Sequence, residues 1–121
     1  MSVWAWIAVA VLSGTAALAR FVIVALLSAR AAGTFPLGTF VVNITGALLL
    51  GLVTGLAVEG DALVQIGSAT LGSYTTFSTW MLETERLTEN GEPPVAAFNI
   101  LLSLFVGVGA IALGRAIGMQ I

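Results

Sequence analysis

Four long apolar runs occupy almost the whole chain and constrain its fold more than any other feature. They cover residues 3–28, 37–58, 62–82 and 95–114, and only the first contains a charged residue, Arg20. A helix of about 20 apolar residues is long enough to cross the hydrocarbon core of a bilayer. The pattern therefore predicts an all-α membrane protein, with four transmembrane helices that form one domain over residues 1–121.

The composition excludes several classes of protein. Hydrophobic residues make up 59% of the chain and charged residues 8%, whereas about a quarter of the residues in a soluble domain are charged. The chain has no cysteine and no histidine, and no pair of nucleophile and base can be assembled, so we do not expect an enzyme. The net charge of −2 is too small to indicate a nucleic-acid partner.

The third run contains a cluster of hydroxyl side chains where lipid would favour leucine. This stretch, Gly72–Trp80, reads GSYTTFSTW. Backbone groups in hydrocarbon must be hydrogen-bonded, so a helix is broken at membrane depth only where the break is buried in protein or lines a watery cavity. We therefore expect the third helix to be broken at mid-membrane and the break to form an ion or substrate site.

Two further polar residues lie within apolar runs, and each has two interpretations. Arg20 either snorkels to the interface or places a positive charge beside an aqueous vestibule that attracts anions. Asn43 either joins two helices or offers its amide donors to a partly dehydrated anion. Gly51 and Gly55 form a GxxxG spacing, which is typical of a close helix crossing.

The fourth run carries a polar stripe and is preceded by a charged segment. Asn99, Ser103 and Gly107 recur every four residues and so share one helix face, as a packing seam or as part of an ion pathway. The charged segment Glu83–Glu92 is interpreted as a solvated interfacial loop.

The arginines outside the first helix give almost no preferred orientation in the membrane. In a four-helix arrangement Arg115 lies on one side and Arg30 and Arg86 on the other, which is too small a bias to fix one topology. This balance predicts that both orientations are populated and that the chain forms an antiparallel dimer.

Several stretches together resemble the Fluc-type (CrcB) fluoride channels. They are FPLGTFVVNITGALLLG at Phe35–Gly51, LGSYTTFSTWMLE at Leu71–Glu83, and the Arg20–Phe21 pair. The resemblance implies a homodimer in dual topology in a bacterial inner or plasma membrane, which lets fluoride leave the cell passively and so lowers cytoplasmic fluoride. It also implies a structural sodium ion at the dimer centre.

The resemblance assigns roles to particular residues. The backbone carbonyls of Gly72 and Thr75 would hold the sodium. The fluoride pore would be lined by Asn43, Phe77, Ser78, Thr79, Trp80, Asn99 and Ser103. Trp80 stands where the family usually has phenylalanine and adds an indole N–H donor, Asn99 stands where a tyrosine is common, and Ala16 replaces a glycine.

Fluoride chemistry agrees with these residue types. A small, strongly hydrated anion needs donors such as amides, hydroxyls and the positive edges of aromatic rings. Lysines would bind it too tightly for release, and the chain has none.

Two other functions remain as alternatives. A proton-coupled exporter with dual topology fits the length, but it normally needs a carboxylate inside the membrane, and Glu83 follows the third run. A structural assembly subunit would not explain the hydroxyl cluster. A requirement for a second, unlike subunit stays open.

Overall fold

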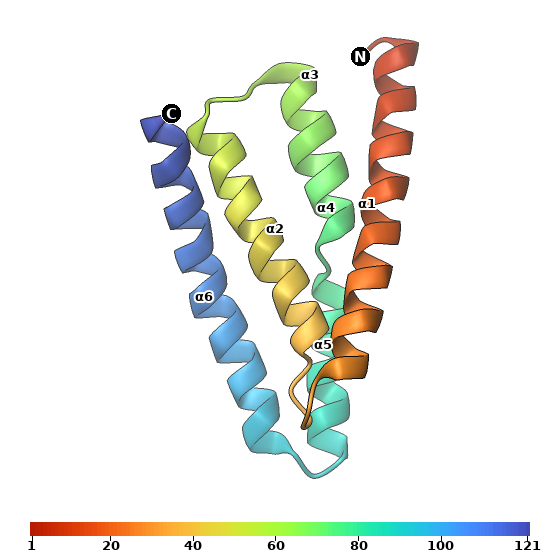
Figure 1. Ribbon diagram of the computed structural model, residues 1–121, viewed down its shortest axis with the longest axis vertical. Coiled ribbons are helices and arrows are strands. Elements are labelled where there is room, and N and C mark those ends of the chain that lie inside the picture. The colour runs from red at the N-terminus through yellow and green to blue at the C-terminus, as the bar shows by residue number, and fades with distance from the viewer.

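Helices account for nearly all of the fold. The computed structural model describes all 121 residues. Its elements are α1 (Val3–Arg30), α2 (Leu37–Gly55), α3 (Gly60–Leu63), the π-helix η1 (Val64–Leu71), α4 (Gly72–Tyr74), α5 (Phe77–Glu89) and α6 (Pro93–Gln120). The elements α3 to α5 follow one another as a single bent segment, so the chain runs along the bundle as four helices, with both termini at the same end (Figure 1).

Three of these helices, α1, α2 and α6, are long and apolar enough to cross a membrane. Large apolar side chains such as Leu18, Phe21 and Phe105 are exposed, whereas the largest fully buried side chains include the polar residues Thr39 and Asn99. This distribution is the reverse of that in a soluble domain, and it suits a bundle whose outer surface faces lipid.

Helices α2 and α6 pack backbone against backbone because glycines lie on both sides of the contact. A Cβ atom added to Gly51 would collide with the Ile111 carbonyl, and one added to Gly114 would collide with the Leu48 carbonyl. Gly55 lies equally close to the backbone of Arg115. The close crossing predicted from the GxxxG spacing is therefore confirmed, and it sets the wall that faces the bent segment.

The helices extend beyond the apolar runs, and this corrects the prediction of a charged loop. Helix α5 continues to Glu89, so that within the predicted loop Glu83, Glu85 and Arg86 are helical, and the turn at residues 90–92 carries only Glu92. Charge ends an apolar run but not a helix, because Glu and Arg are good helix formers and Leu87 on the same helix is buried. The fourth helix likewise runs past Arg115.

Candidate functional site

The bent segment is interrupted at two threonines. Helix α4 ends at Tyr74, and both Thr75 (ψ 163°) and Thr76 (φ −150°, ψ 116°) have extended backbones. The chain then resumes as α5, where the Thr76 hydroxyl caps the helix by accepting from the Thr79 N–H at 3.2 Å. The break thus falls within the hydroxyl cluster of Gly72–Trp80.

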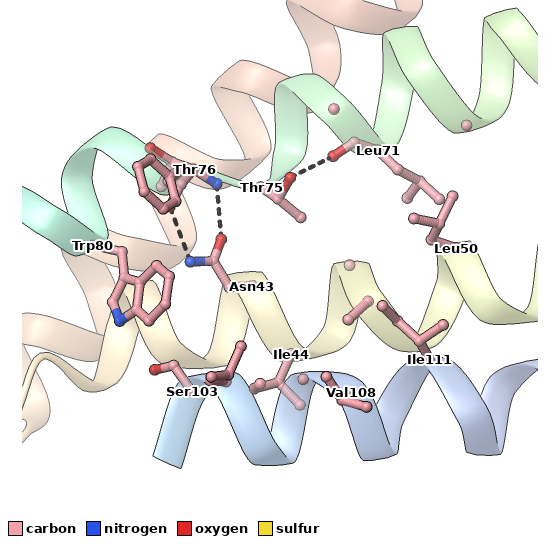
Figure 2. Close-up of a pocket in the computed structure, with 17 residues that line it drawn as sticks. Asn43, Ile44, Leu50, Leu71, Thr75, Thr76, Trp80, Ser103, Val108 and Ile111 are labelled. Carbon is pink, nitrogen blue, oxygen red and sulfur yellow. Dashed lines mark hydrogen bonds between the residues drawn. The ribbon is translucent and has the colours of Figure 1, made fainter. Parts of the chain in front are cut away.

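Asn43 on α2 binds the broken backbone directly. Its Oδ1 accepts from the Thr76 N–H at 2.7 Å, and its Nδ2 donates to the Thr76 carbonyl at 2.9 Å (Figure 2). In a continuous helix the Thr76 N–H would bond to the Gly72 carbonyl. Because Asn43 takes that N–H instead, the Gly72 carbonyl lacks its helical partner. One amide N–H of Asn43 is left for another acceptor.

Other contacts hold the upstream side of the break. The Tyr74 and Thr45 hydroxyls lie 2.9 Å apart, and the Thr75 hydroxyl donates to the Leu71 carbonyl at 3.1 Å. Arg20 lies beside the break, with Nη1 3.5 Å from the Thr75 carbonyl. The Cβ that Gly46 lacks would collide with the Thr75 side chain, so this glycine lets α2 approach the break.

An open groove of about 390 Å³ lies along the break. It is lined by α2, the bent segment and α6, and its walls include most of the predicted site residues: Asn43, Gly72, Thr75, Phe77, Trp80 and Ser103. Figure 2 shows Asn43, Thr76, Trp80 and Ser103 toward one end of the groove, and Leu50, Leu71 and Ile111 toward the other. Polar groups are therefore concentrated where α5 begins.

Four predicted residues do not line this groove. Ser78 is exposed, Thr79 accepts a hydrogen bond from the Thr76 hydroxyl at 3.1 Å, and Arg20 lies on α1. Asn99 is 1% exposed and lies between α5 and α6. The predicted pore residues thus divide into those that line the groove and those that do not.

The two aromatic residues of the groove touch edge to face. The rings of Phe77 and Trp80 are 5.6 Å apart with an interplanar angle of 79°. The Trp80 indole N–H donates to the Asn99 backbone carbonyl at 3.3 Å. The indole donor expected for an ion is therefore already engaged with the protein, and what Trp80 presents to the groove is its ring.

A carboxylate inside the bundle was missed by the sequence reasoning. The Thr39 hydroxyl on α2 donates to Glu83 Oε1 at 2.7 Å, and Glu83 Oε2 is buried without a partner. Thr39 and Asn43 are four residues apart on one face of α2, which could have pointed to a polar contact there. Glu83 is thus held against the start of α2, although the sequence places it after the apolar run.

Known proteins resemble this chain over most of its length. A family described as "CrcB-like protein, Camphor Resistance (CrcB)" matches residues 7–115, a range that contains the whole groove lining. A Mycolicibacterium paratuberculosis protein named fluoride-specific ion channel FluC 2 is 46% identical over 110 residues, covering 91% of this chain and 90% of the relative. A Mycobacterium tuberculosis protein of the same name is 45% identical over 115 residues, covering 95% of this chain and 91% of the relative.

A more distant relative covers a similar range. The Symbiobacterium thermophilum protein named fluoride-specific ion channel FluC 1 is 40% identical over 119 residues, covering 93% of this chain and 96% of the relative. The similarity therefore extends over nearly the full length of each protein.

Proposed function

This chain belongs to the CrcB family, and from that premise we propose that it is a channel that lets fluoride leave the cell passively. It is a multi-pass protein of a bacterial membrane and, like its relatives named as channels, not an enzyme. The observation that carries the proposal is the groove at the broken helix, which Asn43, Phe77 and Ser103 line together.

The groove offers the kinds of donor that a dehydrated fluoride needs. Asn43 has one amide N–H beyond the one given to Thr76, and the edge of the Phe77 ring carries partial positive charge. None of these groups carries a full charge. Binding is therefore weak enough for the ion to leave, which conduction requires.

We propose that a second copy in the opposite orientation closes the groove. Phe77 is 70% exposed in the single chain, and an added Cβ at Gly72 would meet nothing within 4 Å, so this face has room for a partner. The balanced arginines favour no single orientation. Cysteines placed singly at either terminus of this cysteine-free chain should be labelled from both sides of the membrane, and labelling from one side only would refute dual topology.

We further propose that the carbonyls of Gly72 and Thr75 hold a structural sodium ion. The donor set fits a hard monovalent cation, because the Gly72 carbonyl lacks its helical partner and the Thr75 carbonyl has only the 3.5 Å contact from Arg20. The ion would supply positive charge that ties the broken segments of two copies together. Fluoride efflux from liposomes, with chloride as the control ion, tests the channel function itself.

A further inference from the structure

Four residues of α5 and α6 are joined by hydrogen bonds, two between side chains and two from a side chain to a backbone carbonyl. The Trp80 indole N–H donates to the Asn99 backbone carbonyl at 3.3 Å, and the Thr84 hydroxyl donates to the Trp80 backbone carbonyl at 2.8 Å. Asn99 Nδ2 donates to Thr84 Oγ1 at 3.0 Å, and the Ser103 hydroxyl donates to Asn99 Oδ1 at 3.4 Å. Trp80 is thus held at its backbone carbonyl by Thr84 and at its indole by Asn99.

The network divides into two residues that line the groove and two that do not. Trp80 and Ser103 line it, whereas Thr84 is 8% exposed and Asn99 is 1% exposed. Both polar atoms of the Asn99 side chain are already bonded within the protein. Asn99 is buried and does not line the groove, so it acts through its neighbours.

Thr84 determines which way the Asn99 amide faces. Its hydroxyl hydrogen goes to the Trp80 carbonyl, so its oxygen can only accept from Asn99, and the Nδ2 side of the amide must face it. The Oδ1 side then faces Ser103. The Thr84 hydroxyl, which lies behind the groove, therefore fixes the Asn99 amide that Ser103 bonds to, and it ties α6 to α5 beside the bond between the Trp80 indole and the Asn99 backbone.

We infer that Thr84 and Asn99 form a buried brace that positions Trp80 and Ser103 on the groove wall, and that Thr84 is a positioning residue for the ion path. The inference rests on the proposed fluoride channel for its effect on conduction, but the brace itself is independent of that function. Because Trp80 meets Phe77 edge to face, a Trp80 ring released from the brace would also disturb the Phe77 contact.

Helix α5 supplies a matched control. Thr88 lies one turn after Thr84, is exposed, and donates its hydroxyl to the Thr84 carbonyl of its own helix at 3.1 Å. Thr88→Val thus removes a threonine hydroxyl from the same helix without touching the brace. Thr84→Ser keeps the hydroxyl and removes only a methyl group.

The experiment uses Trp80 as its own reporter. The chain has three tryptophans, and replacing Trp4 and Trp6 by phenylalanine leaves Trp80 alone. In this background Thr84→Val should shift the Trp80 emission and lower fluoride efflux from liposomes about tenfold, as expected when a buried amide loses its partner. Thr84→Ser and Thr88→Val should keep both parental values. Parental emission and efflux in Thr84→Val would overturn the brace.

The outcomes separate this inference from the channel proposal. A parent protein that passes no fluoride contradicts the channel, while the emission of the variants still tests the brace. Should Thr84→Val fail to assemble, deuterium exchange of the indole N–H groups in the unmodified protein provides a second test. The Trp80 indole should exchange more slowly than those of Trp4 and Trp6, which are 79% and 60% exposed. Equal exchange rates would overturn the brace.

Discussion

The Asn43 side chain is hydrogen-bonded to both backbone polar groups of Thr76, accepting from the N–H at 2.7 Å and donating to the carbonyl at 2.9 Å. Asn43 on α2 thereby gives the Thr76 N–H the acceptor that it would otherwise find within its own helix. The arrangement satisfies the backbone at the break, which membrane depth demands, and leaves the Gly72 carbonyl for other use.

Replacing Asn43 by aspartate should reduce fluoride efflux steeply. The ionised carboxylate can still accept from the Thr76 N–H, but it cannot donate to the Thr76 carbonyl and it repels an anion. We expect a loss of at least about tenfold. Asn90→Asp, in the exposed turn after α5, adds the same charge away from the groove and should be silent. Undiminished efflux in Asn43→Asp would leave Asn43 a structural role only.

The two aromatic residues of the groove should respond differently to substitution. Phe77→Ile removes the positive ring edge while keeping apolar bulk, so efflux should be abolished in dimers that still form. Trp80→Phe keeps a ring beside Phe77 but loses the indole bond to the Asn99 backbone carbonyl, so conduction should persist at a reduced rate. These rates are measured with a fluoride electrode on liposomes. If folded Phe77→Ile protein conducts at the parental rate, the rings serve packing and not the ion.

Adding one methyl group at Gly46 should destabilise the protein. The new Cβ would collide with the Thr75 side chain at the break, and overpacking of this kind costs roughly 1–3 kcal/mol. Thermal unfolding in detergent measures the loss. Gly109→Ala is the control, because an added Cβ there meets nothing within 4 Å. Equal melting temperatures for the two variants would show that α2 does not need a glycine at the break.

Removal of sodium should weaken the dimer. If the carbonyls of Gly72 and Thr75 hold a cation, exchange of sodium for a large organic cation leaves these carbonyls without a ligand, so melting temperature and efflux should both fall and should recover when sodium is restored. A lithium or potassium series would report the size preference of the site. Unchanged melting temperature and efflux in the organic cation would show that these carbonyls do not hold a structural sodium ion.

The number of helices and the position of the break could be predicted from the sequence because both follow from local chemistry. Apolar runs of spanning length indicate helices wherever they occur, and the hydroxyl cluster around Thr75 is incompatible with a lipid-facing helix. Glycine spacing likewise predicted the close crossing at Gly51, because a missing side chain is visible in the sequence.

The contacts of the site could not be predicted, because they depend on how the helices are rotated about one another. No local pattern indicates that Asn43 meets the Thr76 backbone or that the Trp80 indole binds the Asn99 carbonyl. The π-helical stretch Val64–Leu71 has no simple sequence pattern either. The position of Glu83 was wrongly predicted because the helix was taken to end with its apolar run, whereas α5 continues through charged residues to Glu89.

The central claim is that the groove at the broken helix conducts fluoride, and efflux from liposomes that hold the purified protein tests it most directly. Liposomes are loaded with potassium fluoride or potassium chloride, a potassium ionophore is added, and the released anion is read with an ion-selective electrode. We predict rapid fluoride release with chloride release no faster than from empty liposomes. Fluoride retained as in empty liposomes, or chloride released as fast as fluoride, would contradict the account.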